Sequence, residues 1–148
     1  MATTVSNKVT LMLTNASMNF ATNSFRLILM ASGFVFNEDT HDGYADVSAS
    51  ELPTGNGYTA TGVALTGIAI NEDDADNRTE ITWANASWTA SGGAIGPTPG
   101  AILYDDTVAA PTADPIIGYI DFGGNQTQAA GGVLTISGLE FRIGKAAV

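Results

Sequence analysis

The chain contains no cysteine and very few basic residues. The absence of cysteine excludes disulfide scaffolds and thiol catalysis. Only 5 of the 148 residues are Lys or Arg, against 15 Asp and Glu, so the formal net charge is -10 at pH 7. Proteins that bind nucleic acid or anionic lipid need clustered Lys and Arg, and here the basic residues are scattered. We therefore expect neither nucleic acid nor a membrane as a partner.

Long apolar runs are also missing. No window approaches the roughly 18 apolar residues of a membrane-spanning helix, and the N-terminus lacks the basic and apolar regions of a secretory signal. We expect a protein made in the cytoplasm. Charged residues are 14% of the chain and hydrophobic residues 45%, which argues against disorder and for one folded domain.

Short apolar segments alternate with Gly, Pro, Asn and Asp along the chain. In residues 25–30, apolar residues occupy both alternating sets of positions, as in a strand buried on both faces. Residues 58–70 alternate between apolar and polar like a strand with a Gly break. Ser48 and Glu51 have capping-box spacing before Pro53, which predicts one helical turn. This pattern predicts an all-β fold, an antiparallel β-sandwich or barrel-like single domain with at most short helical turns.

The N-terminal segment is expected to stand apart from this domain. Val9, Leu11 and Leu13 alternate with polar residues, which favours a short strand or an extended arm. We therefore divide the chain into an N-terminal arm or first strand over residues 1–23 and a β-domain over residues 24–148.

Several residues are of types used in metal binding or catalysis, but they lack the partner residues that such sites need. The carboxylates of residues 72–76 are of the type that binds Ca²⁺, but Arg78 occupies the next alternate position and no EF-hand pattern follows. His41, the only histidine, has no Gly-x-Ser-x-Gly motif to accompany it. Asp105 and Asp106 are adjacent, unlike the separated carboxylates of glycosidases. We expect no enzyme activity, no catalytic residues, no cofactor and no metal.

The aromatic residues leave two interpretations open. Trp83 and Trp88, with Tyr58 and Tyr119, would suit a platform for sugar binding. Their odd spacing places the two tryptophans on opposite faces of a regular strand, so at most one joins a platform unless a bulge intervenes. We favour core or interface positions. The candidate assembly residues are Val9, Leu11, Leu13, Trp83 and Trp88.

Several segments resemble, in order, the strands of a family of tailed-bacteriophage virion structural proteins. Residues 81–86 (ITWANA) resemble the family's VTWSNAT strand, residues 101–107 (AILYDDT) its AVIYNDT strand, and residues 115–123 (PIIGYIDFG) its PLIAYIDFG strand. Three further segments are similar to the same family: residues 40–52, 57–65 and 132–143. The resemblance spans most of the chain after about Ser24. The chain departs from the family's pattern in the insert at residues 92–100 and in the last strand at residues 139–142.

The resemblance implies a virion structural protein, most simply a capsid decoration (cement) protein. Such a protein binds the major capsid protein on the outer surface of the capsid and stabilises the head, commonly as a homotrimer. We then expect the arm around Val9 to Leu13 to reach a capsid subunit or a sister protomer, and the domain to stay folded without residues 1–14. The alternatives are a tail or fibre component with a glycan-binding face and a small hydrolase that uses His41.

Overall fold

Antiparallel strands are the main regular structure of the protein, as the sequence predicts. The computed structural model describes residues 2–144, which contain ten strands, two short helices and one 3₁₀ turn. The elements are β1 Ala2–Val5, α1 Asn7–Thr14, β2 Phe25–Leu29, α2 Tyr44–Val47, η1 Ser48–Ser50, β3 Val63–Ala64, β4 Ala69–Asp73, β5 Arg78–Thr82, β6 Ala86–Thr89, β7 Ile95–Asp105, β8 Ile116–Gln128, β9 Val133–Ile136 and β10 Glu140–Gly144. No helix in this part of the chain is long and apolar enough to cross a membrane.

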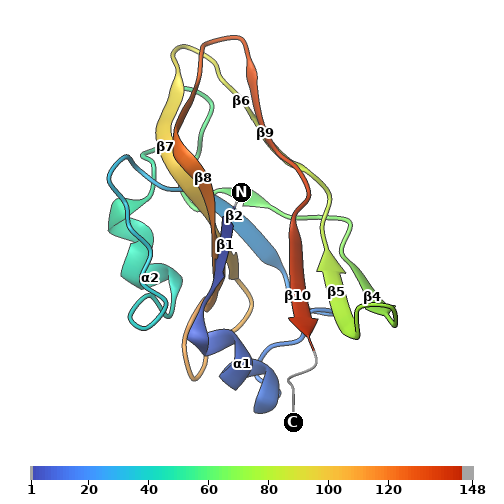
Figure 1. The fold of residues 1–148 in the computed structure, drawn as a ribbon. Helices are drawn as coiled ribbons and strands as arrows, with labels where there is room; N and C mark the ends of the chain where they lie inside the picture. Colours follow the sequence, from blue (N-terminus) through green and yellow to red (C-terminus); the bar gives the residue numbers. More distant parts are fainter. Residues whose placement is uncertain (1, 145–148) are drawn as a thin grey trace.

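The strands form one large sheet and two small ones (Figure 1). The large sheet has the order β1-β8-β7-β2-β3, and the small sheets have the orders β10-β5-β4 and β6-β9. The two small sheets are consecutive parts of one pair of chain segments. β5 of the three-stranded sheet leads into β6 of the two-stranded sheet, and β9 leads back into β10. A hydrogen bond from the Trp83 N–H to the Leu139 carbonyl, 3.1 Å long, bridges the break between them.

The main core lies between the large sheet and the small ones. Leu27 and Leu29 of β2 contribute to it from one side, and Ile81 of β5 and Phe141 of β10 contribute from the other. The ring of Phe20 stacks on that of Phe141, with centroids 5.4 Å apart. One cluster of apolar side chains therefore joins all three sheets.

A second, smaller core covers the other face of the large sheet. Ile28 and Met30 are fully buried there, beside Tyr104 of β7. Phe34 and Phe36, from the segment that follows β2, pack against this cluster. β2 is buried on both faces, which explains why apolar residues occupy both of its alternating sets of positions, and the prediction for residues 25–30 is confirmed.

The prediction of one strand over residues 58–70 is wrong for most of these residues. Only the two residues of β3 and the start of β4 are strand. Gly62 has a φ of +67°, and a Cβ at this position would lie 2.0 Å from the Leu27 carbonyl oxygen. Backbone so close to β2 admits only glycine, and the chain turns there instead of continuing a strand.

The helical turn expected at Ser48 begins earlier. The structure has α2 over Tyr44–Val47, followed by η1. The backbone N–H groups of Asp42 and Gly43 both donate to the Asp46 carboxylate, each at 3.0 Å, so Asp46 caps the helix. Glu51 takes no part in this capping and points into the protein.

The N-terminal segment is part of the fold and forms no extended arm. β1 pairs with β8 in the register Ala2↔Asp121 to Val5↔Gly118. The next residues, expected to be extended, form α1, which begins where the Ser6 hydroxyl accepts a hydrogen bond from the Lys8 N–H. Val9 and Met12, one helical turn apart, are fully buried in the main core. Removal of residues 1–14 would therefore open the core and strip the edge of the large sheet.

We expect Met12→Ala to lower the free energy of unfolding by about 2–5 kcal/mol, because it leaves a cavity in the core. Leu11→Ala, on the same helix, is the matched control: Leu11 is 52% exposed, and its truncation should change stability by less than about 0.5 kcal/mol. Urea denaturation measures both. Equal effects of the two substitutions would contradict the burial of α1.

Candidate functional site

The candidate assembly residues lie mostly inside the protein. Val9, Trp83 and Trp88 are buried in the main core, and Leu13 packs against it. Leu11 alone among the five has a largely exposed side chain. The interface expected from this set therefore has to be sought elsewhere on the surface, apart from Leu11.

Both tryptophans face the core because the strand between them is irregular. Ala84 and Asn85, between β5 and β6, are both exposed, so the alternation of inward and outward residues shifts by one position. Trp83 and Trp88 are thereby brought to the same side, and neither is open to a ligand. The indole N–H of Trp83 has no hydrogen-bond partner among residues 2–144.

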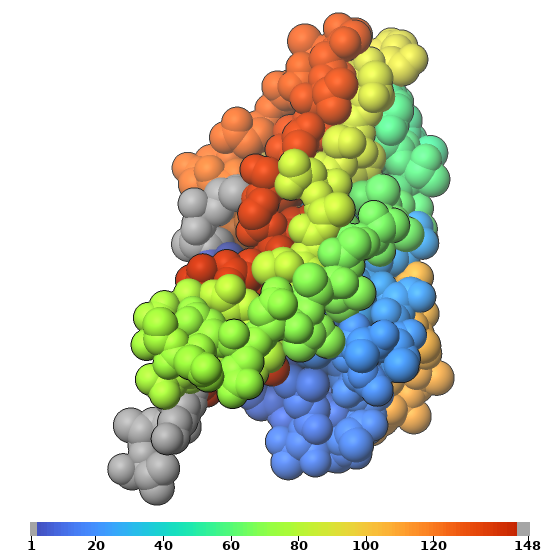
Figure 2. Space-filling view, turned by 90° about the vertical axis from the view of Figure 1, so that its right-hand side faces the viewer, coloured from blue at the N-terminus to red at the C-terminus, as the bar shows by residue number. Residues whose placement is uncertain are grey.

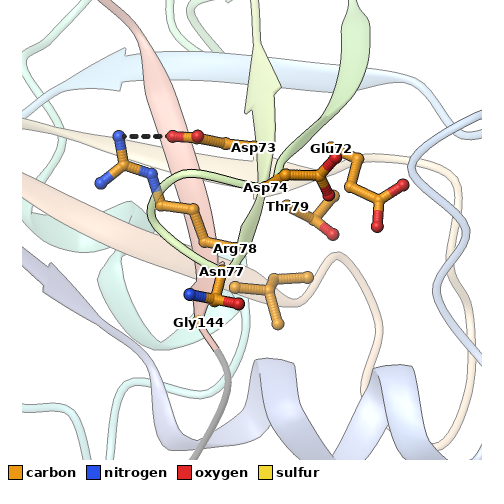
Figure 3. A pocket seen from close by; sticks show the side chains of 8 residues that line it. Glu72, Asp73, Asp74, Asn77, Arg78, Thr79 and Gly144 are labelled. Atoms are coloured by element: carbon orange, nitrogen blue, oxygen red, sulfur yellow. Dashed lines mark ion pairs between the residues drawn. The ribbon is translucent and has the colours of Figure 1, made fainter.

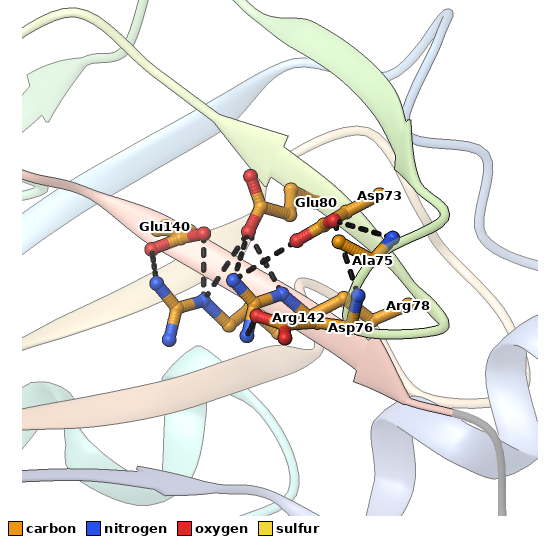
Figure 4. A network of polar contacts seen from close by, with 7 residues as sticks. All are labelled: Asp73, Ala75, Asp76, Arg78, Glu80, Glu140 and Arg142. Atoms are coloured by element: carbon orange, nitrogen blue, oxygen red, sulfur yellow. Dashed lines mark hydrogen bonds and ion pairs between the residues drawn. The ribbon is translucent and has the colours of Figure 1, made fainter.

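A network of ion pairs covers the outer face of the β4–β5–β10 sheet (Figure 4). The Arg78 guanidinium contacts the carboxylates of Asp73, Asp76 and Glu80 at 3.2, 2.9 and 2.6 Å. Arg142, on the neighbouring strand, binds Glu140 at 2.6 Å, and this contact holds the pKa of the Glu140 carboxyl below its usual range. Four carboxylates thus share two guanidinium groups.

The candidate metal loop is organised by its own side chains. One oxygen of Asp73 accepts hydrogen bonds from the N–H groups of Ala75 and Asp76, which closes the turn. The other oxygen binds Arg78. Within residues 2–144, no three His, Cys, Asp or Glu side chains converge as metal ligands. The acidic loop is a hairpin turn built on Asp73 and Arg78.

The core-facing side of the same sheet is only partly covered. The register places Ile70, Ile81 and Phe141 in one row, and Glu72, Thr79 and Ile143 in the next row on that side. Ile81 and Phe141 are buried, whereas Ile70 is 46% exposed and Ile143 is 39% exposed. The sheet therefore extends past the core, and we call this uncovered end the overhang, defined by Ile70, Glu72, Asp74, Thr79 and Ile143.

The overhang borders an open concavity of about 340 Å³ (Figure 3). Glu72 and Asp74 are exposed at its rim, and neither side chain forms an ion pair within residues 2–144. In Figure 2 the yellow-green β4–β5 hairpin projects from the body of the molecule. The overhang combines exposed isoleucines with carboxylates that form no ion pair within residues 2–144, on a projecting sheet.

Glu51 is a buried carboxylate held by two tyrosines. The Tyr58 hydroxyl donates to its Oε1 at 2.5 Å, and the Tyr44 hydroxyl donates to its Oε2 at 2.6 Å. The Leu29 N–H donates in turn to the Tyr58 oxygen at 3.1 Å. Burial first, and then the hydrogen bond to Glu51, raises the pKa of both tyrosines, so both remain proton donors. This group ties the segment after α2 to the end of β2 and leaves the carboxylate no free oxygen for chemistry.

The sequence gives only a faint indication of this group. In the sequence, Glu51 has the spacing of a helix-capping residue, and Tyr58 suits a sugar-binding platform. Nothing in the spacing of Tyr44, Glu51 and Tyr58 indicates that they meet, since contacts across a loop depend on how the loop folds back.

The other residues considered for catalysis are also engaged in local structure. The ring of His41 stacks on Phe34 with centroids 5.5 Å apart, and its Nδ1 accepts from the Asn37 N–H. Asp105 is fully buried and accepts from the Asn23 amide at 2.6 Å, while Asp106 lies 3.6 Å from Arg26.

Comparisons of the chain with protein-family models, with curated proteins and with solved structures find no match.

We expect Glu51→Gln to lower the free energy of unfolding by about 1–3 kcal/mol, because one buried tyrosine hydroxyl then loses its acceptor. Glu72→Gln makes the same chemical change on the exposed overhang and should alter stability by less than about 0.5 kcal/mol. Thermal or urea denaturation compares them. An equal response would show that the Glu51 contacts contribute nothing net.

Asp105 gives a pH-dependent test of the core. Burial raises its pKa from the ordinary value of 3.8, so the folded protein holds this proton more tightly than the unfolded chain. Above the ordinary value and up to the raised one, stability from this group falls as pH rises. The stability of the wild type relative to Asp105→Asn should therefore decrease through this window. If the difference in stability between the wild type and Asp105→Asn does not change with pH, the raised pKa of Asp105 is refuted.

Proposed function

We propose that the chain is a structural protein of a tailed-phage virion, namely a capsid decoration protein. In this proposal it binds the major capsid protein on the outer surface of the shell, stabilises the head and has no catalytic activity. The resemblance of the segments between residues 40 and 143 to phage virion proteins supports the virion context. The observation that carries the assembly role is the overhang.

The overhang has the composition of a surface that is covered on assembly. Ile70 and Ile143 stand on the core-facing side of a sheet, where neighbouring side chains would normally enclose them. Burial of apolar area stabilises a complex by about 25 cal/mol per Å² before the costs of association. The exposed carboxylates of Glu72 and Asp74 add a preference for a partner surface with Lys or Arg.

The edges of the sheets and the net charge also agree with a role outside the shell. β1 and β3 lie at the edges of the large sheet, and β4 and β10 lie at the edges of the three-stranded sheet. Such edges offer backbone N–H and carbonyl groups to a neighbour. The charge of -10 disfavours contact with packaged DNA and favours solubility at high copy number.

Self-association as a homotrimer remains part of the proposal, with a revised contact. Val9 and Leu13 are taken up by the protein's own core and its margin, so an arm that leaves the domain is not the means of contact. Leu11, on the exposed side of α1, is the member of the original set that a sister protomer could cover.

The location in the virion is tested by quantitative mass spectrometry and cryo-electron microscopy of purified particles. A decoration protein should occur in hundreds of copies on the head. Its presence only at the tail would overturn the proposal in favour of a tail or fibre component.

The role of the overhang is tested with two charge reversals. We expect Asp74→Lys to weaken binding of the purified protein to undecorated capsids by about tenfold, the equivalent of 1.4 kcal/mol. Glu38→Lys changes the net charge equally at another exposed position and should bind like the wild type. Occupancy is measured by co-sedimentation. Equal loss in both variants would indicate a general charge effect and contradict docking through the overhang.

A further inference from the structure

A second concavity, away from the overhang, lies where the cover of the smaller core meets the edge of the large sheet. Its volume is about 510 Å³, within the range of small-molecule sites. Phe34 and Phe36 line it from the segment after β2, Thr4 from β1, and Tyr119 and Asp121 from β8. Residues from three distant parts of the chain therefore converge on one hollow.

Tyr119 supplies an unused hydroxyl at this site. Its side chain is only 7% exposed, yet its hydroxyl has no hydrogen-bond partner among residues 2–144. The hydroxyl is not among the fully enclosed polar atoms that lack a partner in that range, of which Trp83 Nε1 is the one found, so its oxygen keeps some exposed surface, and the Tyr119 side chain lines the hollow. Burial and the nearby Asp121 carboxylate raise the pKa of Tyr119, which keeps it a proton donor.

The aromatic walls are fixed before any ligand arrives. Phe36 stacks on Tyr119 with centroids 5.7 Å apart, and Phe34 meets Tyr119 edge to face at 5.6 Å. His41 packs against both phenylalanines at 5.5 and 5.6 Å. Both phenylalanine rings are half-buried. Rings held in this way lose little conformational entropy on binding.

The polar side of the hollow selects against anions. No Lys or Arg among residues 2–144 lines it, and Asp121 is exposed there. One oxygen of Asp121 accepts from the Gly123 N–H at 2.8 Å, and the other oxygen has no partner in that range. Gly123 and Gly124 have no heavy atom within 4 Å of where a Cβ would stand, so a ligand can approach the backbone closely.

We propose that this concavity binds a neutral saccharide. A sugar ring presents a face of C–H groups, which packs on aromatic rings, and a rim of hydroxyls, which pair with the Tyr119 hydroxyl, the free Asp121 oxygen and Thr4. A purely apolar ligand would leave these polar groups unpaired, and a phosphate or acidic sugar would face Asp121 without a counter-charge. This binding is a property of the isolated chain and stands whether the protein belongs to the head or the tail.

The test is a titration of the full-length protein with the methyl glycosides of glucose, galactose, mannose and N-acetylglucosamine, followed by ¹H–¹⁵N NMR. We expect at least one of them to shift the amides of residues 34–36 and 119–124, with a millimolar Kd. Tyr119→Phe removes only the hydroxyl and should weaken binding by about fivefold to tenfold. Asp121→Ala, on the surface, should do the same and does not depend on how the core tolerates a change at position 119.

Tyr104→Phe is the matched control, because the Tyr104 hydroxyl contacts the Thr61 carbonyl oxygen and is absent from the lining. It should bind like the wild type. Glucuronate should bind more weakly than the neutral glycosides. No shift at tens of millimolar, shifts elsewhere only, or unchanged affinity in both site variants would overturn the proposal. Binding of phenol or indole in place of every sugar would also overturn it and indicate a hollow for an apolar side chain of a partner.

Discussion

β2 needs cover on both faces, and much of the structure supplies it. Leu27 and Leu29 face the main core, and Ile28 faces the smaller one, so all three are fully buried. The small sheets and α1 cover the first face. The segment after β2, with α2, covers the second. We call the long segment between β2 and β3 the excursion. If one face of β2 were polar, the excursion would not need to cover it, and the hollow at the margin of this cover would not form.

Glu51 holds that second cover in place at a single buried point. Its two tyrosine partners come from α2 and from the stretch shortly before β3, and Tyr58 also reaches the backbone of β2. A buried carboxylate with both oxygens satisfied favours one arrangement of the chain, because any other arrangement leaves it unpaired. The hollow beside Tyr119, at the edge of this cover, depends on the same arrangement.

The sequence predicts the type of fold well and the placement of particular residues less well. The apolar residues at both alternating sets of positions in β2, interrupted only by Arg26, are a strong indicator, since few other environments tolerate them. Val9, Leu11 and Leu13 suggest a strand, yet Val9 and Met12 are the residues that α1 buries. The eight residues of this segment are too few to distinguish the helical period from the strand period. The tryptophan spacing misleads because the extra outward residue between β5 and β6 has no distinct sequence pattern.

The candidate surfaces are harder to foresee, because each joins segments that tertiary packing alone brings together. The acidic run of residues 72–76 is visible in the sequence, but the uncovered isoleucines beside it depend on where the core ends. Tyr119 lies near Phe34 and Phe36 through the folding of the excursion over the sheet, and no spacing in the sequence encodes that distance.

The enclosure of both tryptophans has a spectroscopic consequence. Trp83 lies among Phe20, Phe25 and the rest of the main core, and its indole N–H has no partner among residues 2–144. Trp88 lies beside Tyr58. We expect them to emit as indoles in an apolar medium and to shift to longer wavelength when water enters the core. Since neither ring lines the overhang or the hollow beside Tyr119, intrinsic fluorescence reports the integrity of the fold separately from events at either surface.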